Sequence, residues 1–528
     1  MSKKMNDGLL VTGALTVLGV AMCFAGPAAT PPASIAPATM RRVGTIDERF
    51  QSYNIEMVEV TGGRFWKPYG SKAEAKQPDA NQPSGMDPSL YEYRSPINLS
   101  HARLRKLAAA LGPAYVRVSG TWANTTYFHN SDDPVPATPP TGFKGVLTRQ
   151  QWKGVVDFSH VVNAEIVTSF AISAGTRDAS GVWTPEQAHQ ILAYTKSVGG
   201  SIAAAEYMNE PTIPEMGGAP KGYDAAAFGR DVGVFRAFAK QFAPGMLILG
   251  PGGVGEGTAL VPDSMHAVTS DGILSVTGPV FDAFSYHSYG AVSSRCAAMG
   301  ASASTSSDAA LSEEWLARPE QIEQFYGSLR DRYEPGKPLW LTETAQAACG
   351  GDRWASAFLD SFRYLNQLGV LAKRGVQVHM HNTLAASDYG LIDEKTYEPR
   401  PNYWAALLWR RLMGTTVLDP GPPRTPSLHI YAHCLRDHPG GVALLAINAD
   451  RAEAHSLEVP TASERYTLTA KDLTDKQAQL NGSDLKLGAD DALPELKGAP
   501  TPSGKITIAP ASIVFLALPE AHNASCQR

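Results

Sequence analysis

The segment IAAAEYMNEP (residues 202–211) passes from an apolar run directly into polar and acidic residues. A short apolar run bounded by polar residues is typical of a buried strand. Such a strand brings Asn209 and Glu210 to one edge of a sheet. A second segment, LWLTET (residues 339–344), has the same form and brings Glu343 to a strand end.

Apolar segments of this kind recur along the chain. The expected strands are Gln51–Val58, Ala114–Val118, Ile166–Ile172, Ala203–Met208, Met246–Gly250, Ala283–His287, Leu339–Thr342 and Val376–Met380. The amphipathic segments between them include Leu99–Leu111, Pro185–Val198, Tyr223–Phe242, Pro319–Arg332 and Ala355–Lys373. Eight strands with intervening helices predict an α/β fold, a (β/α)8 TIM barrel. A doubly wound open sheet is the alternative, but no glycine-rich phosphate loop follows the first strand.

The pattern changes after Trp409, where short apolar segments alternate with turns that contain Gly, Pro and Asp. These segments are Leu428–His433, Val442–Ile447, Tyr466–Thr469 and Ile506–Leu518. They predict a C-terminal antiparallel β-sandwich. We expect the barrel over residues 49–408 and the sandwich over residues 409–528, with a linker and an N-terminal strand that joins the sandwich over residues 30–48.

The first residues have the form of a secretory signal peptide. Lys3 and Lys4 precede an uncharged apolar run over residues 9–25, and small residues follow it. This pattern predicts a signal peptide over residues 1–29 and a secreted or periplasmic protein. An uncleaved N-terminal anchor is the alternative, because 17 apolar residues are close to the shortest membrane span. No later segment predicts a membrane span.

The composition is that of an ordinary globular protein, with 43% hydrophobic and 18% charged residues among 528. The formal net charge is -5, which gives no electrostatic reason to expect binding to nucleic acid or to an anionic membrane. We expect a monomer, and any polyanionic substrate would need a local basic groove.

Four cysteines remain outside the predicted signal peptide, and an even number in an exported chain permits two disulfides with three possible pairings. We favour Cys434 with Cys526 and Cys296 with Cys349. Their wide spacing does not match zinc or redox motifs. His379 and His381 share one strand face, but without a clear third ligand we expect no metal and no cofactor.

Two glutamates at the carboxyl ends of barrel strands fit glycoside hydrolysis. This reaction needs one carboxylic acid to protonate the leaving oxygen and one carboxylate on the other side of the sugar. Active sites of such barrels lie at the carboxyl ends of the strands, where Glu210 and Glu343 are expected. The alternative is that each glutamate is buried against an arginine or begins a helix.

The sequence resembles heparanase and its relatives in glycoside hydrolase family 79. The resemblance runs from about residue 45 to the C-terminus. It is carried by the Asn-Glu-Pro motif, by Glu343 at the end of the seventh strand, and by blocks at residues 104–108, 112–121, 284–289, 340–344, 389–394, 401–404, 428–434 and 479–482.

The resemblance implies a role for several residues. Glu210 corresponds to the acid/base, Glu343 to the nucleophile, and Asn209 to the asparagine at the sugar 2-hydroxyl. Tyr289 corresponds to the tyrosine that orients the nucleophile. The remaining matches are binding residues: Glu56 for a sugar hydroxyl, Thr121 and Asn382 for other positions of the sugar, and Gly350, Gly351 and Tyr389 for backbone amides that hold the glucuronic carboxylate.

The resemblance implies a retaining β-glucuronidase that acts on a glucuronic-acid-containing oligo- or polysaccharide. A neutral-sugar retaining glycosidase of the same clan and a noncatalytic carbohydrate-binding protein are the alternatives. Paired clusters of Lys and Arg like those of the animal enzyme are missing, which leaves recognition of sulfated chains open. The local basic candidates are Arg103, Arg105, Lys106, Lys144, Arg149, Lys153 and Arg177.

Overall fold

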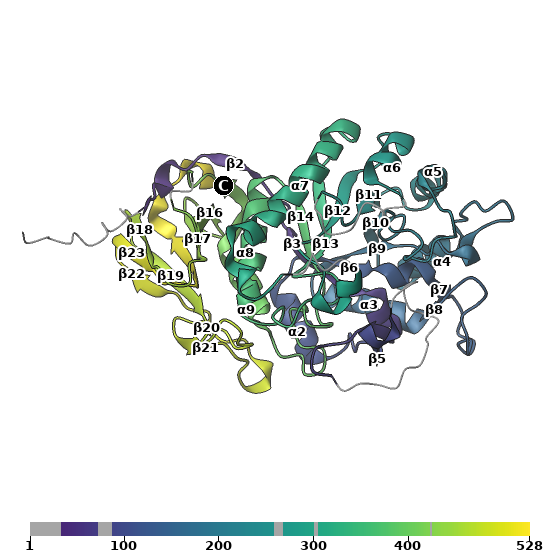
Figure 1. Ribbon diagram of the computed structural model, residues 1–528, viewed down its shortest axis with the longest axis horizontal. Coiled ribbons are helices and arrows are strands. Elements are labelled where there is room, and N and C mark those ends of the chain that lie inside the picture. The colour runs from purple at the N-terminus through teal and green to yellow at the C-terminus, as the bar shows by residue number, and fades with distance from the viewer. Residues whose placement is uncertain (1–32, 72–86, 258–267, 300–304, 423–424, 528) are drawn as a thin grey trace, which may run out of the picture.

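The computed structural model describes residues 33–71, 87–257, 268–299, 305–422 and 425–527. A barrel surrounded by helices lies beside a β-sandwich, with helices α8 and α9 between the two (Figure 1). The predicted signal peptide and residues 72–86 lie outside the described residues. Within the described residues, no helix is both long and apolar enough to cross a membrane.

Eight parallel strands close into one barrel and confirm the predicted fold class. Around the barrel in chain order they are β3 (Gln51–Glu56), β6 (Ala114–Ser119), β9 (Ala164–Ser169), β10 (Ile202–Glu206), β11 (Leu247–Gly253), β12 (Ala283–Tyr289), β13 (Leu339–Ala345) and β14 (Val378–His381). β14 pairs in parallel with β3, which closes the ring.

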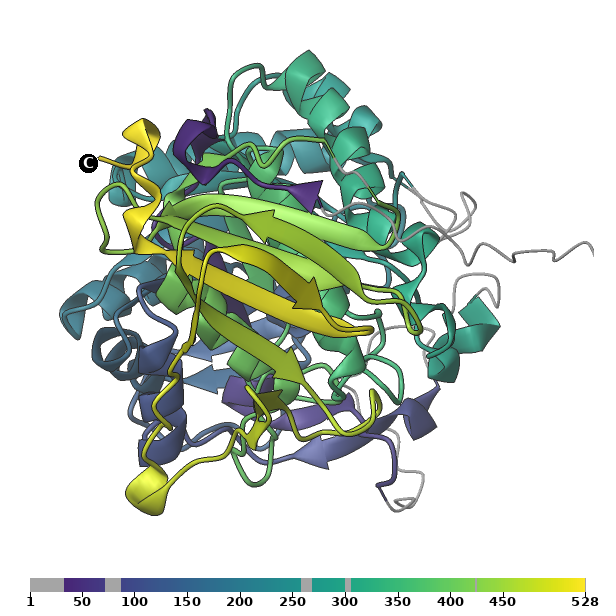
Figure 2. The ribbon, with the colours of Figure 1, turned by 90° about the vertical axis from the view of Figure 1, so that its left-hand side faces the viewer.

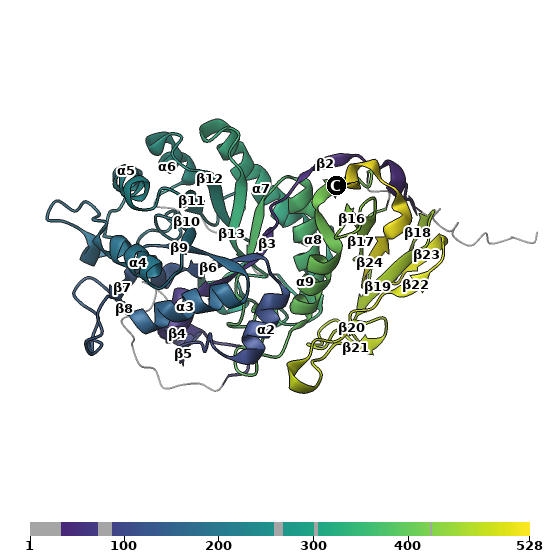
Figure 3. The ribbon, with the colours of Figure 1, turned by 180° about the vertical axis from the view of Figure 1, so that it is seen from behind.

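Helices cover the outside of this barrel, as Figures 1 and 3 show from opposite sides. They are α2 (Ala102–Ala110), α3 (Arg149–Val161), α4 (Glu186–Ser197), α5 (Ala225–Phe242), α6 (Ser270–Thr277), α7 (Glu313–Tyr333), α8 (Leu359–Lys373) and α9 (Pro401–Leu412). The expected start of α7 at Pro319 is wrong. Ser312 caps the helix by accepting from the backbone N–H of Trp315, so α7 begins six residues earlier and contains Pro319.

Side chains alternate between the inside and the outside of the barrel because successive strand residues point to opposite faces. One apolar cluster inside the barrel consists of Tyr115, Val167, Ala204, Leu249, Ala283, Trp340, Val378 and Met380. Two residues further along their strands, Arg117, Glu206 and Ser285 replace apolar side chains with charged and polar ones. The barrel interior is therefore apolar toward the amino ends of the strands and polar at their carboxyl ends.

The C-terminal sheet is built mainly from β2 (Arg42–Thr45), β15 (Met413–Leu418), β16 (Leu428–Leu435), β17 (Val442–Asn448), β24 (Ser512–Leu518) and β19 (Ser463–Thr469). β2 comes from the N-terminal segment and pairs antiparallel with β15. Figure 2 shows this sheet face-on in front of the barrel. The division at residues 408 and 409 stays a prediction, and α9 spans it.

A second, smaller sheet completes the sandwich with β1 (Ala33–Ser34), β18 (His455–Val459) and β23 (Gly504–Ile508). The single strand expected over Ile506–Leu518 is wrong: β23 and β24 are separate strands of different sheets, and Ala511 between them has φ 43°. Apart from Asn448 and Ser512, β17 and β24 are apolar, because one face contacts the smaller sheet and the other contacts α8 and α9.

Candidate active site

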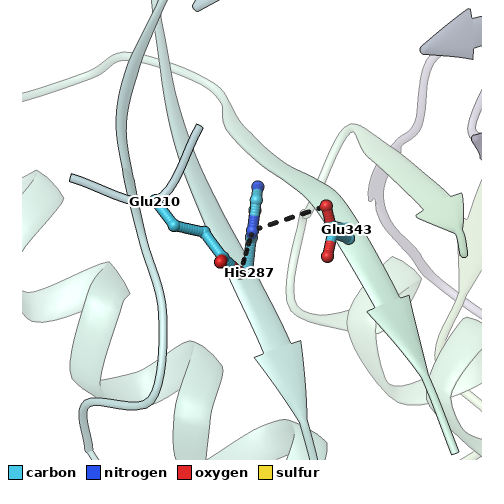
Figure 4. A group of neighbouring side chains, drawn as sticks. All are labelled: Glu210, His287 and Glu343. Carbon is cyan, nitrogen blue, oxygen red and sulfur yellow. Dashed lines mark hydrogen bonds and ion pairs between the residues drawn. The ribbon is translucent and has the colours of Figure 1, made fainter. Parts of the chain in front are cut away.

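The two predicted carboxylates face one another at the carboxyl ends of their strands. Glu343 lies within β13, and Glu210 follows β10 in a backbone conformation with φ 51°. Both side chains are buried. One oxygen of each carboxylate and one ring nitrogen of His287 all lie within 4.8 Å of one another (Figure 4). The structure thus brings the predicted pair together in one site.

Glu343 is held by two strong hydrogen-bond donors. Tyr289 donates its hydroxyl proton to Oε1 at 2.6 Å, and Arg117 donates from Nη1 to Oε2 at 2.9 Å. Glu343 is thus a buried glutamate paired with an arginine, as the alternative interpretation expected. It does not remove Glu343 from the site, since the same side chain also lines the pocket.

Arg117 also donates hydrogen bonds to two residues beside the two carboxylates. Its Nη2 donates to Glu206 at 2.8 Å and to the side-chain oxygen of Asn209 at 2.7 Å. Burial opposes ionisation of Glu206, but the charge of Arg117 and other partners lower the pKa of Glu206 below its ordinary value. Arg117 and Glu206 were not predicted as site residues. A charged residue inside the apolar run AYVRVS (residues 114–119) is the signal that could have found Arg117.

His287 connects Glu210 with this network. Its Nδ1 lies 3.1 Å from Glu210, and its Nε2 lies 3.2 Å from Nη2 of Arg117. Burial disfavours the imidazolium, but the charge of Glu343 and the hydrogen bond with Glu210 raise the pKa of His287 overall. His287 is therefore a hydrogen-bonded residue at the mouth of the barrel.

The pKa of Glu210 is raised from its ordinary value. Burial is the largest cause, and the nearby charge of Glu343 adds to it, whereas the hydrogen bond with His287 acts in the opposite direction. A raised pKa keeps a carboxyl group protonated at a pH where ordinary carboxylates are ionised. Glu210 therefore has the property that a general acid needs.

A second polar cluster lies beside Glu343 and contains three more predicted residues. The side-chain amide of Asn382 donates to Glu56 at 3.1 Å and lies 3.4 Å from the hydroxyl of Tyr389. Burial and the charge of Glu343 raise the pKa of Glu56 well above its ordinary value. Gly120 is required here, because a Cβ at this position would lie 1.5 Å from Oε2 of Glu56.

A pocket of about 130 Å³ joins these groups. Among the predicted residues it is lined by Glu56, Thr121, Glu210, Tyr289, Glu343, Asn382 and Tyr389. Aromatic walls come from Trp66, Tyr91 and Trp122, which the sequence did not single out. Several buried polar atoms of the lining have no hydrogen-bond partner among the described residues: Oε2 of Glu56, the Tyr91 hydroxyl, Nε1 of Trp122 and Oδ1 of Asn382. They leave unused donors and acceptors for a hydroxylated ligand.

Gly350 and Gly351 are not among the residues that line the pocket, which include the preceding Ala348 and Cys349, but they lie against the lining residues Trp66 and Tyr389. Both glycines have positive φ, near 80°, and a Cβ on Gly350 would lie 2.6 Å from Oγ of Ser387. Within the described parts of the chain, neither backbone N–H has a hydrogen-bond acceptor. These amides remain available to an anionic group.

The two histidines of β14 lie outside this site. His379 and His381 pack edge-on against Tyr364 on the helical side of the barrel, and burial lowers both of their pKa values. Among the described residues, the one group that could converge on a cation is Glu210, His287 and Glu343. Arg117 already donates to Glu343 and opposes a cation there by its own charge.

Comparison with known proteins finds relatives over most of the chain, although no protein-family model matches it. Heparanase of Bos taurus is 26% identical over 523 residues, which cover 85% of this chain and 88% of that protein. Hyaluronoglucuronidase of Hirudo nipponia is also 26% identical, over 84% of this chain and 95% of that protein.

These similarities support a place in the heparanase/glucuronidase-like family, glycoside hydrolase family 79. A solved 4-O-α-L-rhamnosyl-β-D-glucuronidase from Fusarium oxysporum matches 92% of this chain and 99% of its own, with a TM-score of 0.60 and 12% identity. At that identity the match supports the fold of this heparanase-like chain and nothing further.

The basic residues considered for a sulfated substrate are mostly engaged elsewhere in this heparanase-like chain. Arg103 pairs with Glu398 and Asp491, and Arg177 pairs with the buried Asp231. Four more make local contacts: Arg149 with Asp132, Lys153 with Asp157, Arg105 with the Leu99 carbonyl and Lys106 with the Asp490 carbonyl. None of the seven candidates lines the pocket around Glu210 and Glu343, as far as the described residues show.

Two disulfides match the favoured pairing, Cys296 with Cys349 and Cys434 with Cys526. We expect replacement of Cys296 and Cys349 by alanine to raise KM for a glucuronide several-fold, because Cys349 directly precedes the glycine pair. Loss of a loop of 53 residues should also lower the free energy of unfolding by about 4 kcal/mol. Steady-state kinetics and thermal unfolding measure the two effects.

Cys434 and Cys526 provide a matched control, because this bridge joins β16 to the C-terminus in the sandwich and closes a loop of 92 residues. Replacing both by alanine should lower stability by a similar amount and leave KM unchanged. An equal rise in KM in both double variants would contradict a local role for the bridge at the pocket.

Proposed function

We propose that this chain is a retaining β-glucuronidase that hydrolyses β-linked glucuronic acid by double displacement. The observation that carries the proposal is the pair Glu210 and Glu343, whose nearest oxygens lie within 4.8 Å of each other in one pocket. Retaining glycosidases hold their two carboxyl groups about 5–5.5 Å apart, whereas inverting enzymes need about 6.5–9.5 Å for a water molecule. The close approach of the pair supports retention.

In the first step, Glu343 attacks the anomeric carbon and forms a covalent glycosyl-enzyme. Tyr289 and Arg117 hold its two oxygens, so one lone pair can be aimed at the sugar without rotation of the carboxylate. Glu210 gives its proton to the glycosidic oxygen, and the alcohol leaves. The bond from carbon to the leaving oxygen breaks as the bond to Glu343 forms.

In the second step, the ionised Glu210 accepts a proton from water, which attacks the same carbon from the face that the alcohol left. The bond to Glu343 breaks, and glucuronic acid is released with its original configuration. His287 contacts Glu210 in both steps and can donate a hydrogen bond to its carboxylate form. Asn209, held by Arg117, is our candidate for the sugar 2-hydroxyl.

The unused donors and acceptors of the pocket support a sugar as the ligand, since buried polar atoms in proteins are otherwise nearly always hydrogen-bonded. The free amides of Gly350 and Gly351, together with Tyr389, support glucuronic acid. Backbone N–H groups can bind the sugar carboxylate without adding another charged side chain near Glu343. The raised pKa of Glu56 also favours binding of an anionic sugar, because a protonated Glu56 does not repel it.

The proposal predicts the alkaline side of the pH profile. Glu210 must be protonated in the free enzyme, so kcat/KM should fall as pH rises through its raised pKa. Replacing His287 by alanine removes an interaction that lowers the pKa of Glu210, so the alkaline limb should move to higher pH. Rates measured across the pH range test this. A limb that moves to lower pH would contradict the assignment of Glu210.

Activity on matched aryl glycosides tests the proposed function against its alternatives. We expect turnover of an aryl β-glucuronide and little turnover of the corresponding β-glucoside or β-xyloside. A preference for the glucoside or xyloside would favour a neutral-sugar glycosidase. Absence of turnover on all three would favour a noncatalytic carbohydrate-binding protein. Export through the N-terminal signal remains part of this proposal.

A further inference from the structure

Arg400 is a buried cation that the proposed mechanism does not use. It directly precedes helix α9, and the residue is 7% exposed. Its Nη1 donates to the backbone carbonyls of Ser387, Asp388 and Gly390 at 2.7, 3.0 and 3.2 Å. One guanidinium thus holds three carbonyls of the loop that includes Tyr389, a residue of the pocket lining.

The hydrogen bond to the Asp388 carbonyl fixes the direction of the next amide. The C=O and N–H groups of a planar trans peptide point in opposite directions. The peptide between Asp388 and Tyr389 is trans, so the Tyr389 N–H points away from Arg400. Among the described residues this N–H has no hydrogen-bond acceptor. Arg400 therefore holds one unpaired donor in place at a residue that lines the pocket.

The same guanidinium orients the Gly351 amide through the neighbouring peptides. The Ser387 carbonyl is turned toward Arg400, so the Asp388 N–H points the other way. This N–H donates to the carbonyl of Gly350 at 3.3 Å, and the Ser387 hydroxyl donates to the same carbonyl at 3.0 Å. Because the Gly350 carbonyl is held on that side, the trans peptide turns the Gly351 N–H away from Ser387.

We propose that Arg400 is a positioning residue for recognition of the glucuronic carboxylate. It acts through the loop, by holding the amides of Tyr389 and Gly351 as free donors on the side that faces the sugar. The loop is buried, so a carbonyl released from Arg400 regains a hydrogen bond only if its peptide rotates. Rotation would turn the following amide away from the sugar. This inference rests on the proposed glucuronidase function and adds the residue that orients its carboxylate site.

The experiment compares an aryl β-glucuronide with the methyl ester of the same compound, which keeps the ring but has no negative charge. We expect Arg400→Met to raise KM for the glucuronide about tenfold with little change in kcat, because hydrogen bonds to a charged group are weakened. The kcat/KM of the ester should change little. The preference for the acid, which is the ratio of the two kcat/KM values, should therefore fall about tenfold.

Two further variants separate positioning from a general loss of structure. Arg400→Lys should restore most of the preference, because an ammonium group carries three N–H donors for the three carbonyls. Ser387→Ala removes the hydroxyl donor to Gly350 without removing a charge, and it should lower the preference about threefold.

Arg410→Met is the matched control. Arg410 lies at the other end of α9 and also donates to two backbone carbonyls, those of Gly112 and Glu48, but it is not among the residues that line the pocket. This variant should lower the temperature of thermal unfolding and keep the preference for the acid.

An equal fall in kcat/KM for the acid and the ester in Arg400→Met would indicate a structural role alone and would overturn the inference. An unchanged preference in Ser387→Ala would also overturn it, and this variant decides if Arg400→Met does not fold. Failure of the natural sequence to cleave any glucuronide would instead overturn the proposed function, and this inference with it.

Discussion

Replacing Glu343 by glutamine should lower kcat/KM for an aryl β-glucuronide by about 10⁴-fold or more, the scale seen when a catalytic nucleophile is removed. The amide is nearly the same size and can keep hydrogen bonds with Tyr289 and Arg117, but it cannot form the glycosyl ester. Steady-state kinetics on the purified variant measure the loss. Glu186→Gln on the surface of α4 is a matched control and should retain full activity.

The alanine variant distinguishes a nucleophile from a residue that merely supports the site. Glu343→Ala leaves space beside the anomeric carbon, and added azide can attack there in its place. We expect azide to restore turnover and to give the α-glucuronyl azide, whose configuration is inverted. Failure of azide to restore turnover, or formation of the β-azide, would assign the nucleophile elsewhere.

Replacing Glu210 by alanine should lower kcat/KM by about 10²–10⁴-fold for glucuronides with poor leaving groups, the range typical of a lost general acid. The loss should shrink for a highly acidic phenol, because such a leaving group departs without protonation. A plot of rate against leaving-group acidity measures this dependence, which should be steeper for the variant than for the natural sequence.

Azide also distinguishes an acid/base from a nucleophile, because the azide product expected here has the opposite anomeric configuration. In Glu210→Ala the glycosyl-enzyme on Glu343 still forms from an activated substrate, and azide should attack it to give the β-glucuronyl azide. An equal loss for poor and good leaving groups would contradict the acid role. Asn209→Ala serves as a neighbouring comparison, because it should weaken turnover without changing the dependence on leaving-group acidity.

The barrel was predictable because its strands are short apolar runs with polar ends, and all eight were expected within a few residues of their observed positions. The residue at which a strand ends was less predictable where a local hydrogen bond determines it. The first strand was expected to reach Val58, but β3 ends at Glu56. The backbone N–H of Glu56 donates to the side chain of Glu59, and helix α1 (Met57–Thr61) begins there. The sandwich strand β18 was missed since it is short and half-polar.

The two carboxylates were predictable from position alone, but their surroundings were not. Arg117 and Glu206 form an ion pair inside the barrel, and nothing in the spacing of 89 residues between them indicates contact. Trp66 and Tyr91 stack with ring centroids 4.6 Å apart, and they come from opposite ends of a segment that has no periodicity in the sequence. The barrel brings Arg117 to Glu206, and antiparallel pairing of β4 (Gly63–Trp66) with β5 (Tyr91–Arg94) brings Trp66 to Tyr91.

The stereochemistry of the first product tests double displacement at this site, because it depends on both carboxylates acting in sequence. Proton NMR of an aryl β-glucuronide, recorded within minutes of adding the protein, identifies the anomer formed before mutarotation. We expect β-glucuronic acid to appear first and the α-anomer only later. Initial release of α-glucuronic acid would show inversion and would contradict double displacement by Glu343 and Glu210.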